Sequence, residues 1–590
     1  MLLDDPIANV LYIDLNRKKY EIRRREDLFS KYIGGTGVAT QLLLEECPKG
    51  TDSLGKHNPI IFAISPMTSL FPIVSKTVAM FKSPHTNDLG ESHSGGRSAI
   101  SIRMAGFGAI VINGASDEPI YLAIHEDKIY FRDASTLWGM GSNFTVGRII
   151  KENEPNPGIR SIMRIGKGGE NLISYACVIT ESYRHFGRLG LGAVFGSKKL
   201  KALVISGKKS IPISDIRAYK KLYNNIYKTI TESSVMKKYH EIGTPINVNP
   251  LNEMGALPSH NLKYTRNDKA HNISGERFAK DYLGRRIACA HCPIGCIHIA
   301  ALRIPYENKP YFYKTSMIAY DYEPIYSLGA MVGIYNPEDY LKLMDEVEVL
   351  CVDAMSMGVI LSWAIEAYEK GIITDKETMG IEFKWGDVKQ LINAVKLVVK
   401  QPNKFYKALA KGVDFASSQF GGKDFALSFG KNEMAGYHTG PATHIGALIG
   451  ARHGHLDNAG YSIDQKILTK KAASPKEVVD LLLLEEELRQ VLSSISICFF
   501  ARGVYNLELI SKALKISDFN FSVEELNDIG KKIHREKYKF KLREGFDFKN
   551  LKLPKRIFET TTPVGDLDRE YIQDAIDYAK DVIIGDLECD

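Results

Sequence analysis

The chain has 590 residues, of which 77 are basic and 70 acidic, and its net charge of +7 is too small and too evenly spread to indicate a nucleic-acid-binding surface. No stretch reaches 18 apolar residues, and the acidic start MLLDDPIANV is unlike a secretory signal, so we expect a cytoplasmic protein without a membrane segment. Eight cysteines are too few for a disulfide framework, and clustered thiols in a reducing compartment indicate metal.

Residues 1–210 carry a strand pattern. NVLYIDLNRKKYEIR at 9–23 and IYLAIHEDKIYFRD at 120–133 predict two hairpins with polar turns. Short β-branched runs bounded by Gly, Pro or Ser predict three further strands, at 59–65, 108–114 and 201–207. We therefore expect a β-rich unit in this part of the chain.

Residues 211–590 are mostly helical by periodicity. Apolar residues recur three and four positions apart in DYLKLMDEVEVL, SWAIEAYEKG and EVVDLLLLEEELRQVL. One helix is expected to run into EVLCVDAMSMG near Asp353 and another into VLSSISICFF near Cys498, each ending in a short break that contains a cysteine. A chain of this length is expected to form two or three domains.

Glycine-rich stretches concentrate in the β-rich unit, at 32–37, 91–99, 164–171 and 187–199. Glycine lets backbone amides approach an anion, and the neighbouring Arg188, Lys198 and Lys199 add positive charge, which suits a phosphate or pyrophosphate. Turns in a β-rich domain explain the same stretches, and none fits a Rossmann fingerprint or a P-loop.

The stretch ACAHCPIGCIH, residues 288–298, has the spacing C-x2-C-x3-C at Cys289, Cys292 and Cys296. Zinc with a histidine of this stretch as the fourth ligand is one interpretation. Three thiolates on one tight loop and a distant fourth favour a cubane iron-sulfur cluster. Periodicity does not choose the fourth ligand among the remaining cysteines, which are Cys47, Cys177, Cys351, Cys498 and Cys589.

Five blocks of sequence together resemble the aldehyde:ferredoxin oxidoreductase family of tungsten enzymes. The first block begins with YIGGTGVATQLLLEECPKG. The other four blocks are SHSGGRSAISIRMAGFGAIVINGAS, GRLGLGAVFGSKKLKALVISG, NEMGALPSHN and YEPIYSLG. They follow the order of the family, with the cysteine loop between the fourth and the fifth, and the resemblance covers almost the whole chain.

The resemblance implies an α+β fold around a tungsten, rarely molybdenum, bis-pyranopterin cofactor. Residues 1–210 would form the β-sheet base that binds the pterins, 211–420 a mostly helical domain with the cysteine loop, and 421–590 a helical C-terminal domain with the last cluster cysteine. One 4Fe-4S cluster is implied on Cys289, Cys292, Cys296 and Cys498.

The family binds its pterins with the motif D-x-x-G-L-C and its sister D-x-x-G-L-D. The first falls on Ser493 to Cys498 with only partial agreement, and the second falls on Glu348 to Asp353, where the last carboxylate is retained. The resemblance assigns Asp353 to the amino-pyrimidine end of the cofactor and Arg188 to the phosphate end. The residues assigned to cofactor binding are His93, Ser94, Gly95, Gly96, Arg188, Leu189, Gly190, Gly192, Asp353 and Ser493. The carbonyl of His93 is implied as a ligand of a magnesium ion between the phosphates.

The family's catalytic pair is a glutamate and a histidine close to the metal. Glu323 in YEPIYSLG matches the glutamate, although a longer segment than usual separates it from the cysteine loop. His455 is favoured over His453 for the histidine, and His260 in PSHN is a third candidate.

The implied reaction oxidises an aldehyde to a carboxylate and passes electrons to ferredoxin or to a partner iron-sulfur subunit. The active-site subunit of an aromatic acyl-coenzyme A reductase complex is an alternative within the same family. A non-catalytic zinc or electron-transfer protein is an alternative of another class. We expect a homo-oligomer or a subunit of a complex; the resemblance implies no particular substrate or reaction direction.

Overall fold

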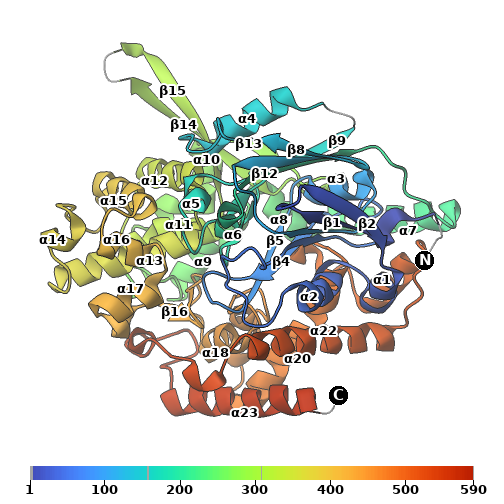
Figure 1. The fold of residues 1–590 in the computed structure, drawn as a ribbon. Helices are drawn as coiled ribbons and strands as arrows, with labels where there is room; N and C mark the ends of the chain where they lie inside the picture. The colour runs from blue at the N-terminus through green and yellow to red at the C-terminus, as the bar shows by residue number, and fades with distance from the viewer. Residues whose placement is uncertain (1–3, 156–157, 182, 307–308, 589–590) are drawn as a thin grey trace.

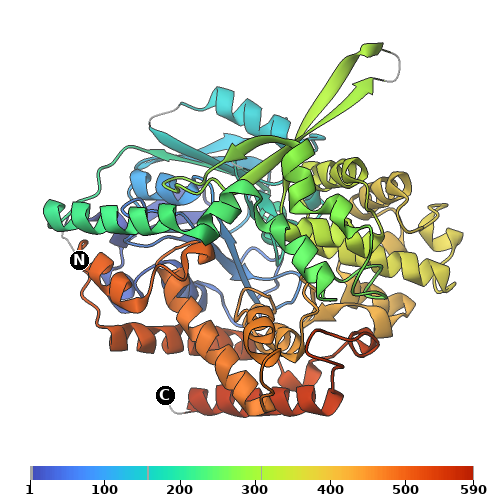
Figure 2. The same ribbon diagram turned by 180° about the vertical axis from the view of Figure 1, so that it is seen from behind.

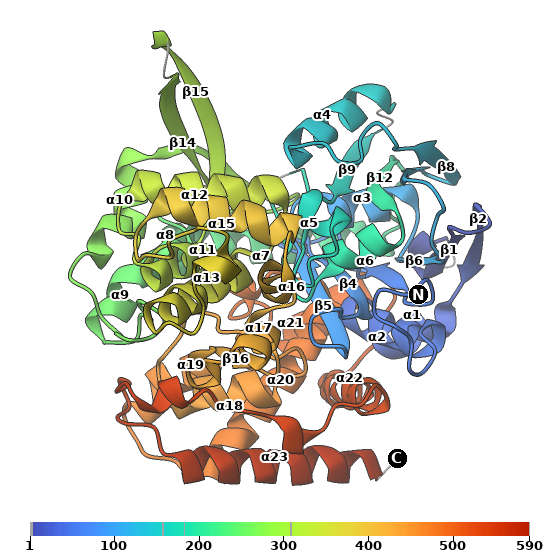
Figure 3. The ribbon, with the colours of Figure 1, turned by 60° about the vertical axis from the view of Figure 1, so that its left-hand side comes forward.

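The computed structural model describes residues 4–155, 158–181, 183–306 and 309–588. Its architecture is α+β, as predicted: two six-stranded sheets come first, and a largely helical region follows. Figure 3 shows the β-rich part in blue to cyan, the middle helices in green to yellow and the C-terminal helices in orange to red around a common centre. No helix among the described residues is both long and apolar enough to cross a membrane.

The first sheet contains the first predicted hairpin. Its strands, in spatial order, are β2 (Lys19–Arg24), β1 (Asn9–Asp14), β6 (Ala109–Asn113), β3 (Ile60–Ala63), β4 (Thr77–Lys82) and β5 (Leu89–Ser94). β1 pairs antiparallel with β2 and parallel with β6. The central strands are buried on both faces, which explains their unbroken β-branched runs.

The second sheet contains the second predicted hairpin, β7–β8. Its strands are β11 (His185–Phe186), β10 (Val178–Ile179), β9 (Ile159–Arg164), β12 (Leu200–Gly207), β7 (Ile120–His125) and β8 (Lys128–Asp133). The helices of this part include α1 (Glu26–Tyr32), α2 (Gly35–Glu46), α3 (Ser98–Ala105), α4 (Asn143–Asn153), α5 (Lys167–Glu170) and α6 (Leu191–Ser197). One large apolar core runs from these sheets into the helical region.

The helical region contains the three predicted helices as α12, α13 and α20. Helices of its middle part are α7 (Ile216–Glu232), α8 (Ser234–Glu241), α9 (Val248–Glu253), α10 (Gly275–Asp281), α11 (Tyr322–Leu328), α12 (Pro337–Leu350), α13 (Ala354–Glu369), α14 (Asp375–Thr378), α15 (Val388–Lys400), α16 (Lys404–Leu409) and α17 (Val413–Phe420). Helices of its C-terminal part are α18 (Pro441–Ile449), α20 (Pro475–Ser494), α21 (Leu507–Lys515), α22 (Val523–Arg543) and α23 (Arg569–Glu588). Asn336 caps α12, and a capping box at Ser474 begins α20.

The breaks after α12 and α20 form two similar joints with the β-rich part. At the first joint, Cys351 has a φ of 62° and Val352 forms an antiparallel bridge with Ala176. At the second joint, Ser496 has a φ of 60° and Ile497 forms an antiparallel bridge with Val74. The two stretches near Asp353 and Cys498, each predicted as a helix that ends in a break containing a cysteine, therefore have the same backbone arrangement.

A third sheet interrupts the helical region, and it was not predicted. It consists of β13 (Leu283–Ile287), β14 (Ile297–Tyr306) and β15 (Lys309–Tyr320) in that order. The cysteine loop connects β13 to β14, and the β14–β15 hairpin, which we call the arm, projects from the body of the molecule (Figure 1).

Candidate active site

A cavity of about 380 Å³ lies where the three parts of the chain meet. Strand β5 and residues 184–189 contribute one side, α11 and the end of α12 another, and residues 452–456 and 497–500 the rest. Charged groups and apolar side chains both line it. The apolar part includes Ile297, Met344, Val347, Leu456, Phe499 and Phe500.

Three of the predicted cluster cysteines, Cys289, Cys296 and Cys498, line this cavity. Burial, with a smaller contribution from the neighbouring Cys289 and Cys498 thiolates, raises the pKa of Cys292 to about 12. Burial likewise raises the pKa of Cys296, and the Arg184 guanidinium opposes the rise. Such thiols ionise when a cation compensates their charge, which is what an iron-sulfur cluster supplies.

The backbone around Ile73 holds the two cysteine segments together. Its N–H donates to the His291 carbonyl in the cysteine loop at 3.0 Å, and its carbonyl accepts from the Cys498 N–H at 3.2 Å. On the other side of the loop, a Cβ added to Gly95 would lie 2.6 Å from the Cys289 sulfur. Only glycine therefore allows the backbone just after strand β5 to approach the loop this closely.

The other described cysteines do not belong to the two segments that Ile73 connects, although Cys177 also lines the cavity. Cys177 and Cys351 form a buried pair at the first joint, with their sulfur atoms 3.5 Å apart, and Cys47 is buried in the core. Cys589 lies outside the described residues. Among the residues that the structure describes, no three His, Cys, Asp or Glu side chains are arranged to hold a single metal ion.

Glu323 and His455, the favoured catalytic pair, lie together in the cavity. His455 Nε2 is 3.4 Å from Glu323 Oε1, and the Tyr437 hydroxyl donates to the same oxygen at 2.9 Å. Burial favours a high pKa for Glu323, but the bonds and charge of His455 and Tyr437 outweigh it, so the pKa is lowered. The Tyr437 ring stacks on both His455 and Tyr461, which fixes the imidazole.

The other two candidate histidines do not line this cavity. His453 is buried, with Nε2 2.9 Å from Lys541 Nζ and Nδ1 3.2 Å from the Ala447 carbonyl oxygen. His260 contacts the Ser259 hydroxyl at 2.8 Å and packs against Trp385. Both imidazoles are engaged by protein groups.

Arg188 and Asp353 lie beside each other at the cavity wall. Arg188 Nε donates to Asp353 Oδ2 at 3.2 Å, and Arg188 Nη2 donates to the Glu433 carbonyl at 2.7 Å. The Asp353 carboxylate also caps α13 by accepting from the Met355 and Ser356 N–H groups. The two side chains thus form an ion pair, and their assignment to the two ends of the cofactor stays a prediction.

Several buried polar atoms of the cavity lining have no hydrogen-bond partner in the described structure. They are Glu348 Oε1 and Oε2, Arg188 Nη1 and Asn432 Oδ1. His185 Nε2 is 3.8 Å from Glu348 Oε1, beyond hydrogen-bond distance. Burial, followed by the charges of Asp345 and Cys351, raises the pKa of Glu348 well above its usual range. The oxygen atoms of Glu348 and Asn432 can accept hydrogen bonds from N–H groups of a ligand, and Arg188 Nη1 can donate to an anionic group. A pterin phosphate has both kinds of group.

The remaining predicted cofactor residues divide into two groups. His93 and Leu189 line the cavity, and the His93 side chain bonds to Glu91 at 2.7 Å. The others lie behind the lining. Gly96 accepts from the Ala290 N–H, and Gly190 and Gly192 pack against the backbone of residues 174–177. Ser94 donates to the Gly95 carbonyl, and the Ser493 carbonyl faces Gly35.

Sequence reasoning missed Tyr437, Asn432, Arg184 and Arg452, which contact or line the cavity. It named Glu348 only as a poor match to a motif. None of these residues belongs to a spacing pattern that indicates a site. The only feature of the sequence that could have indicated one of these residues is the carboxylate of Glu348, which stands among apolar residues at the end of α12.

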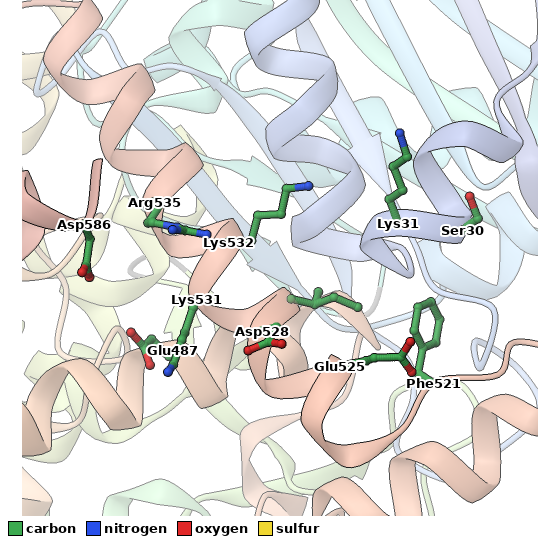
Figure 4. A pocket seen from close by; sticks show the side chains of 11 residues that line it. Ser30, Lys31, Glu487, Phe521, Glu525, Asp528, Lys531, Lys532, Arg535 and Asp586 are labelled. Atoms are coloured by element: carbon green, nitrogen blue, oxygen red, sulfur yellow. The ribbon is translucent and has the colours of Figure 1, made fainter. Parts of the chain in front are cut away.

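A larger hollow of about 690 Å³ lies on the surface between α1, α20, α22 and α23 (Figure 4). Its lining carries charges of both signs, which include Lys31, Lys532, Arg535, Glu487 and Asp528. It contains none of the predicted site residues. We therefore place the candidate active site in the smaller interior cavity.

Two family descriptions match this chain. Residues 10–207 match "Aldehyde ferredoxin oxidoreductase, N-terminal domain", and residues 221–582 match "Aldehyde ferredoxin oxidoreductase, domains 2 & 3". A tungsten-containing aldehyde ferredoxin oxidoreductase of Thermococcus kodakarensis is 32% identical over 92% of this chain and 89% of that protein. The WOR-like subunit of an aliphatic sulfonate oxidoreductase of Pyrococcus furiosus is 28% identical over 89% of this chain and 84% of that protein.

A solved structure has the same fold. It is the active-site complex BamBC of benzoyl-coenzyme A reductase with 1,5-dienoyl-CoA, and its matching chain superposes with a TM-score of 0.81. The identity is 20%, and the match covers 98% of this chain and 94% of the other.

Proposed function

The chain belongs to the aldehyde ferredoxin oxidoreductase family, and on that premise we propose that it is a tungsten-pterin enzyme that oxidises an aldehyde to a carboxylate. The observation that carries the proposal is the Glu323–His455 pair, set in one cavity with unpartnered polar atoms and cluster-type cysteines. Membership of an oxidoreductase family rules out the alternative of a non-catalytic zinc or electron-transfer protein.

The cavity residues fit the cofactor that the family implies. Arg188 Nη1 would bind a pterin phosphate, and Glu348 with Asn432 would accept from pterin N–H groups. Asp353 would hold Arg188 in position, and the His93 carbonyl would be a ligand of a magnesium ion. Cys289, Cys292, Cys296 and Cys498 would bind one 4Fe-4S cluster. When bound, the tungsten pterin supplies a two-electron acceptor and the cluster a one-electron outlet.

The protein's own groups manage the protons of this reaction. An aldehyde and water give a carboxylic acid, two protons and two electrons, so a base must accept protons next to the substrate. Glu323 is suited to this task because its lowered pKa keeps it ionised, and His455, 3.4 Å away, stabilises that ionised form. Tyr437 donates to Glu323 and holds the carboxylate toward the imidazole.

The test is metal analysis of anaerobically purified protein followed by aldehyde assays with a viologen dye. We expect tungsten and iron in the protein and dye reduction that depends on the aldehyde. Zinc without tungsten and iron, or metallated protein that oxidises no aldehyde, would contradict the proposal.

A second candidate is the active-site subunit of an aromatic acyl-coenzyme A reductase complex. The apolar side of the cavity favours it, since Phe499 and Phe500 offer a surface for an aromatic ring. Turnover of an aromatic acyl-coenzyme A thioester with a co-purified partner, and of no aldehyde, would favour this candidate.

A further inference from the structure

The arm connects the cysteine loop to the candidate catalytic helix. Strand β14 begins directly after Cys296, and β15 ends two residues before Tyr322, the first residue of α11. The strands pair antiparallel from His298↔Tyr320 to Pro305↔Tyr313, and Figures 1 and 2 show the hairpin standing clear of the body. A protein bound along the arm therefore reaches the cysteine loop at the base of the arm.

Aromatic side chains are exposed on the outer half of the arm. The exposed fractions are 53% for Tyr306, 90% for Tyr311, 64% for Phe312 and 49% for Tyr313. A projecting two-stranded hairpin is marginally stable alone, and grouped exposed aromatic rings are typical of binding sites. Tyrosine and phenylalanine are enriched in the centres of protein interfaces.

The same sheet carries exposed basic side chains on both of its faces next to the cysteine loop. Arg285 on β13 and Arg303 on β14 are exposed on one face, because they share a register position on alternating strands. Arg286 is exposed on the other face, where Lys314 on β15 is 62% exposed and lies 3.8 Å from Asp345. Arg286 precedes Cys289 by three residues, a span of about 10 Å of extended chain. A basic surface of this kind favours a partner with acidic side chains and steers its approach.

Residues 289–293 of the cysteine loop are themselves partly exposed. The third sheet thus joins a redox-type cysteine loop and basic side chains at the base of the arm to an aromatic anchor on its outer half. A small molecule needs no such extended surface, whereas a protein that must approach the cluster does.

We propose that β13 and the arm form the docking surface for the electron acceptor, a small acidic iron-sulfur protein, and hold it over the cysteine loop. The inference rests on the proposed function, because it takes Cys289, Cys292, Cys296 and Cys498 as the outlet for electrons. The aromatic outer half anchors the carrier, and the arginines of β13 orient its acidic side toward the loop.

Two variants of the holoenzyme separate the aromatic from the electrostatic contribution. One combines Tyr311→Ser, Phe312→Ser and Tyr313→Ser, and the other combines Arg285→Glu with Arg286→Glu. Tyr20→Ser is the matched control, because Tyr20 is 44% exposed on β2, remote from the arm. The kinetic constants are measured with a viologen dye and with a bacterial ferredoxin that carries two four-iron clusters.

Each variant should raise the KM for ferredoxin roughly ten-fold or more, a change of about 1.4 kcal/mol. The dye kinetics should stay within about two-fold, because the arm residues lie outside the cavity, and the control should match the parent in both assays. Charge reversal should also remove the salt dependence of the KM for ferredoxin.

An unchanged KM for ferredoxin in both variants, with normal dye turnover, would overturn the inference. The inference would also be overturned if a variant sediments as a monomer, the parent sediments as an oligomer, and the ferredoxin kinetics of the two are the same. The arm would then be a contact between copies of this chain. Absence of aldehyde-dependent dye reduction in the parent would contradict the proposed function instead. Ferredoxin binding by interferometry tests the docking surface without turnover.

Discussion

Replacing Glu348 by Met should stabilise the protein without its cofactor and weaken its hold on the cofactor. Both carboxyl oxygens are buried and have no hydrogen-bond partner among the described residues, and His185 Nε2 lies 3.8 Å from Oε1. A buried polar group without a hydrogen bond costs about 1–3 kcal/mol, and Met has a similar shape without that cost. The apo-protein should therefore gain about 1–3 kcal/mol in resistance to unfolding.

Glu433 is the matched control, because it is equally buried but fully bonded. Its carboxylate accepts from Ser356 Oγ at 2.7 Å and from the Val413 N–H at 3.0 Å, and His85 Nε2 lies 2.8 Å away. Glu433→Met leaves these groups unpaired and should cost about 3–5 kcal/mol. The same substitution should thus raise the free energy of unfolding at Glu348 and lower it at Glu433.

The effect of Glu348→Met should grow with pH. The pKa of Glu348 is raised in the folded protein, so the unfolded state loses its proton first, near pH 4.3. Below that pH both states keep the proton and the carboxyl adds no pH dependence. Above it, the parent loses stability progressively until the folded carboxyl also ionises, and the Met variant escapes this loss.

Guanidinium unfolding of the apo-proteins at pH 4, 6 and 8 measures the stability, and tungsten and pterin contents of the holo-proteins measure retention of the cofactor. We expect Glu348→Met to unfold at higher denaturant than the parent at pH 8 and to contain less tungsten and pterin. A variant that is less stable than the parent, or that retains the full cofactor content, would refute the reasoning.

Three further predictions concern the remaining site residues. Cys498→Ala should lose iron and the paramagnetic signal of the reduced cluster, whereas Cys47→Ala should keep both; a complete cluster in the Cys498 variant would assign the fourth ligand elsewhere. Glu323→Gln and His455→Asn should each lower the aldehyde-dependent rate by about 10²- to 10⁴-fold while tungsten and iron remain, as measured by dye reduction and metal analysis. Loss of the metals along with activity would mean that the pair is structural. Arg188→Ala should lower pterin and tungsten together, and normal contents of both would contradict its role at the phosphate.

The elements with strong local patterns were predictable. The β1–β2 and β7–β8 hairpins and helices α12, α13 and α20 lie where alternation and helical periodicity indicated them. The arm was missed, because its outer strands combine exposed apolar residues with a proline and do not alternate as a half-buried sheet does.

Two departures from the family's pterin motifs leave the backbone conformation unchanged, which the sequence alone does not reveal. Cys351 and Ser496 stand where the family has glycine, and both have left-handed backbones, with φ of 62° and 60°. The joints therefore keep the backbone shape that glycine favours, at a cost that a small side chain tolerates.

The contacts between distant side chains were the least predictable part of the site. Glu323 and His455 were selected through the family resemblance, and the hydrogen bond from Tyr437 to Glu323 joins residues 114 positions apart without any motif. Asn432 and Glu348 can be recognised as candidate ligand-binding residues only because the fold buries their oxygen atoms without hydrogen-bond partners.

The position of Ile73 sets an order of events during maturation. This residue bonds to both cysteine segments, and each of them is synthesised more than 200 residues after it. The thiols of the loop and Cys498 can therefore gather only after the C-terminal helices have packed against the β-rich part. A cluster on these proposed ligands would be inserted only after Cys498 has been synthesised, and a chain truncated before Cys498 would lack one of the four thiols.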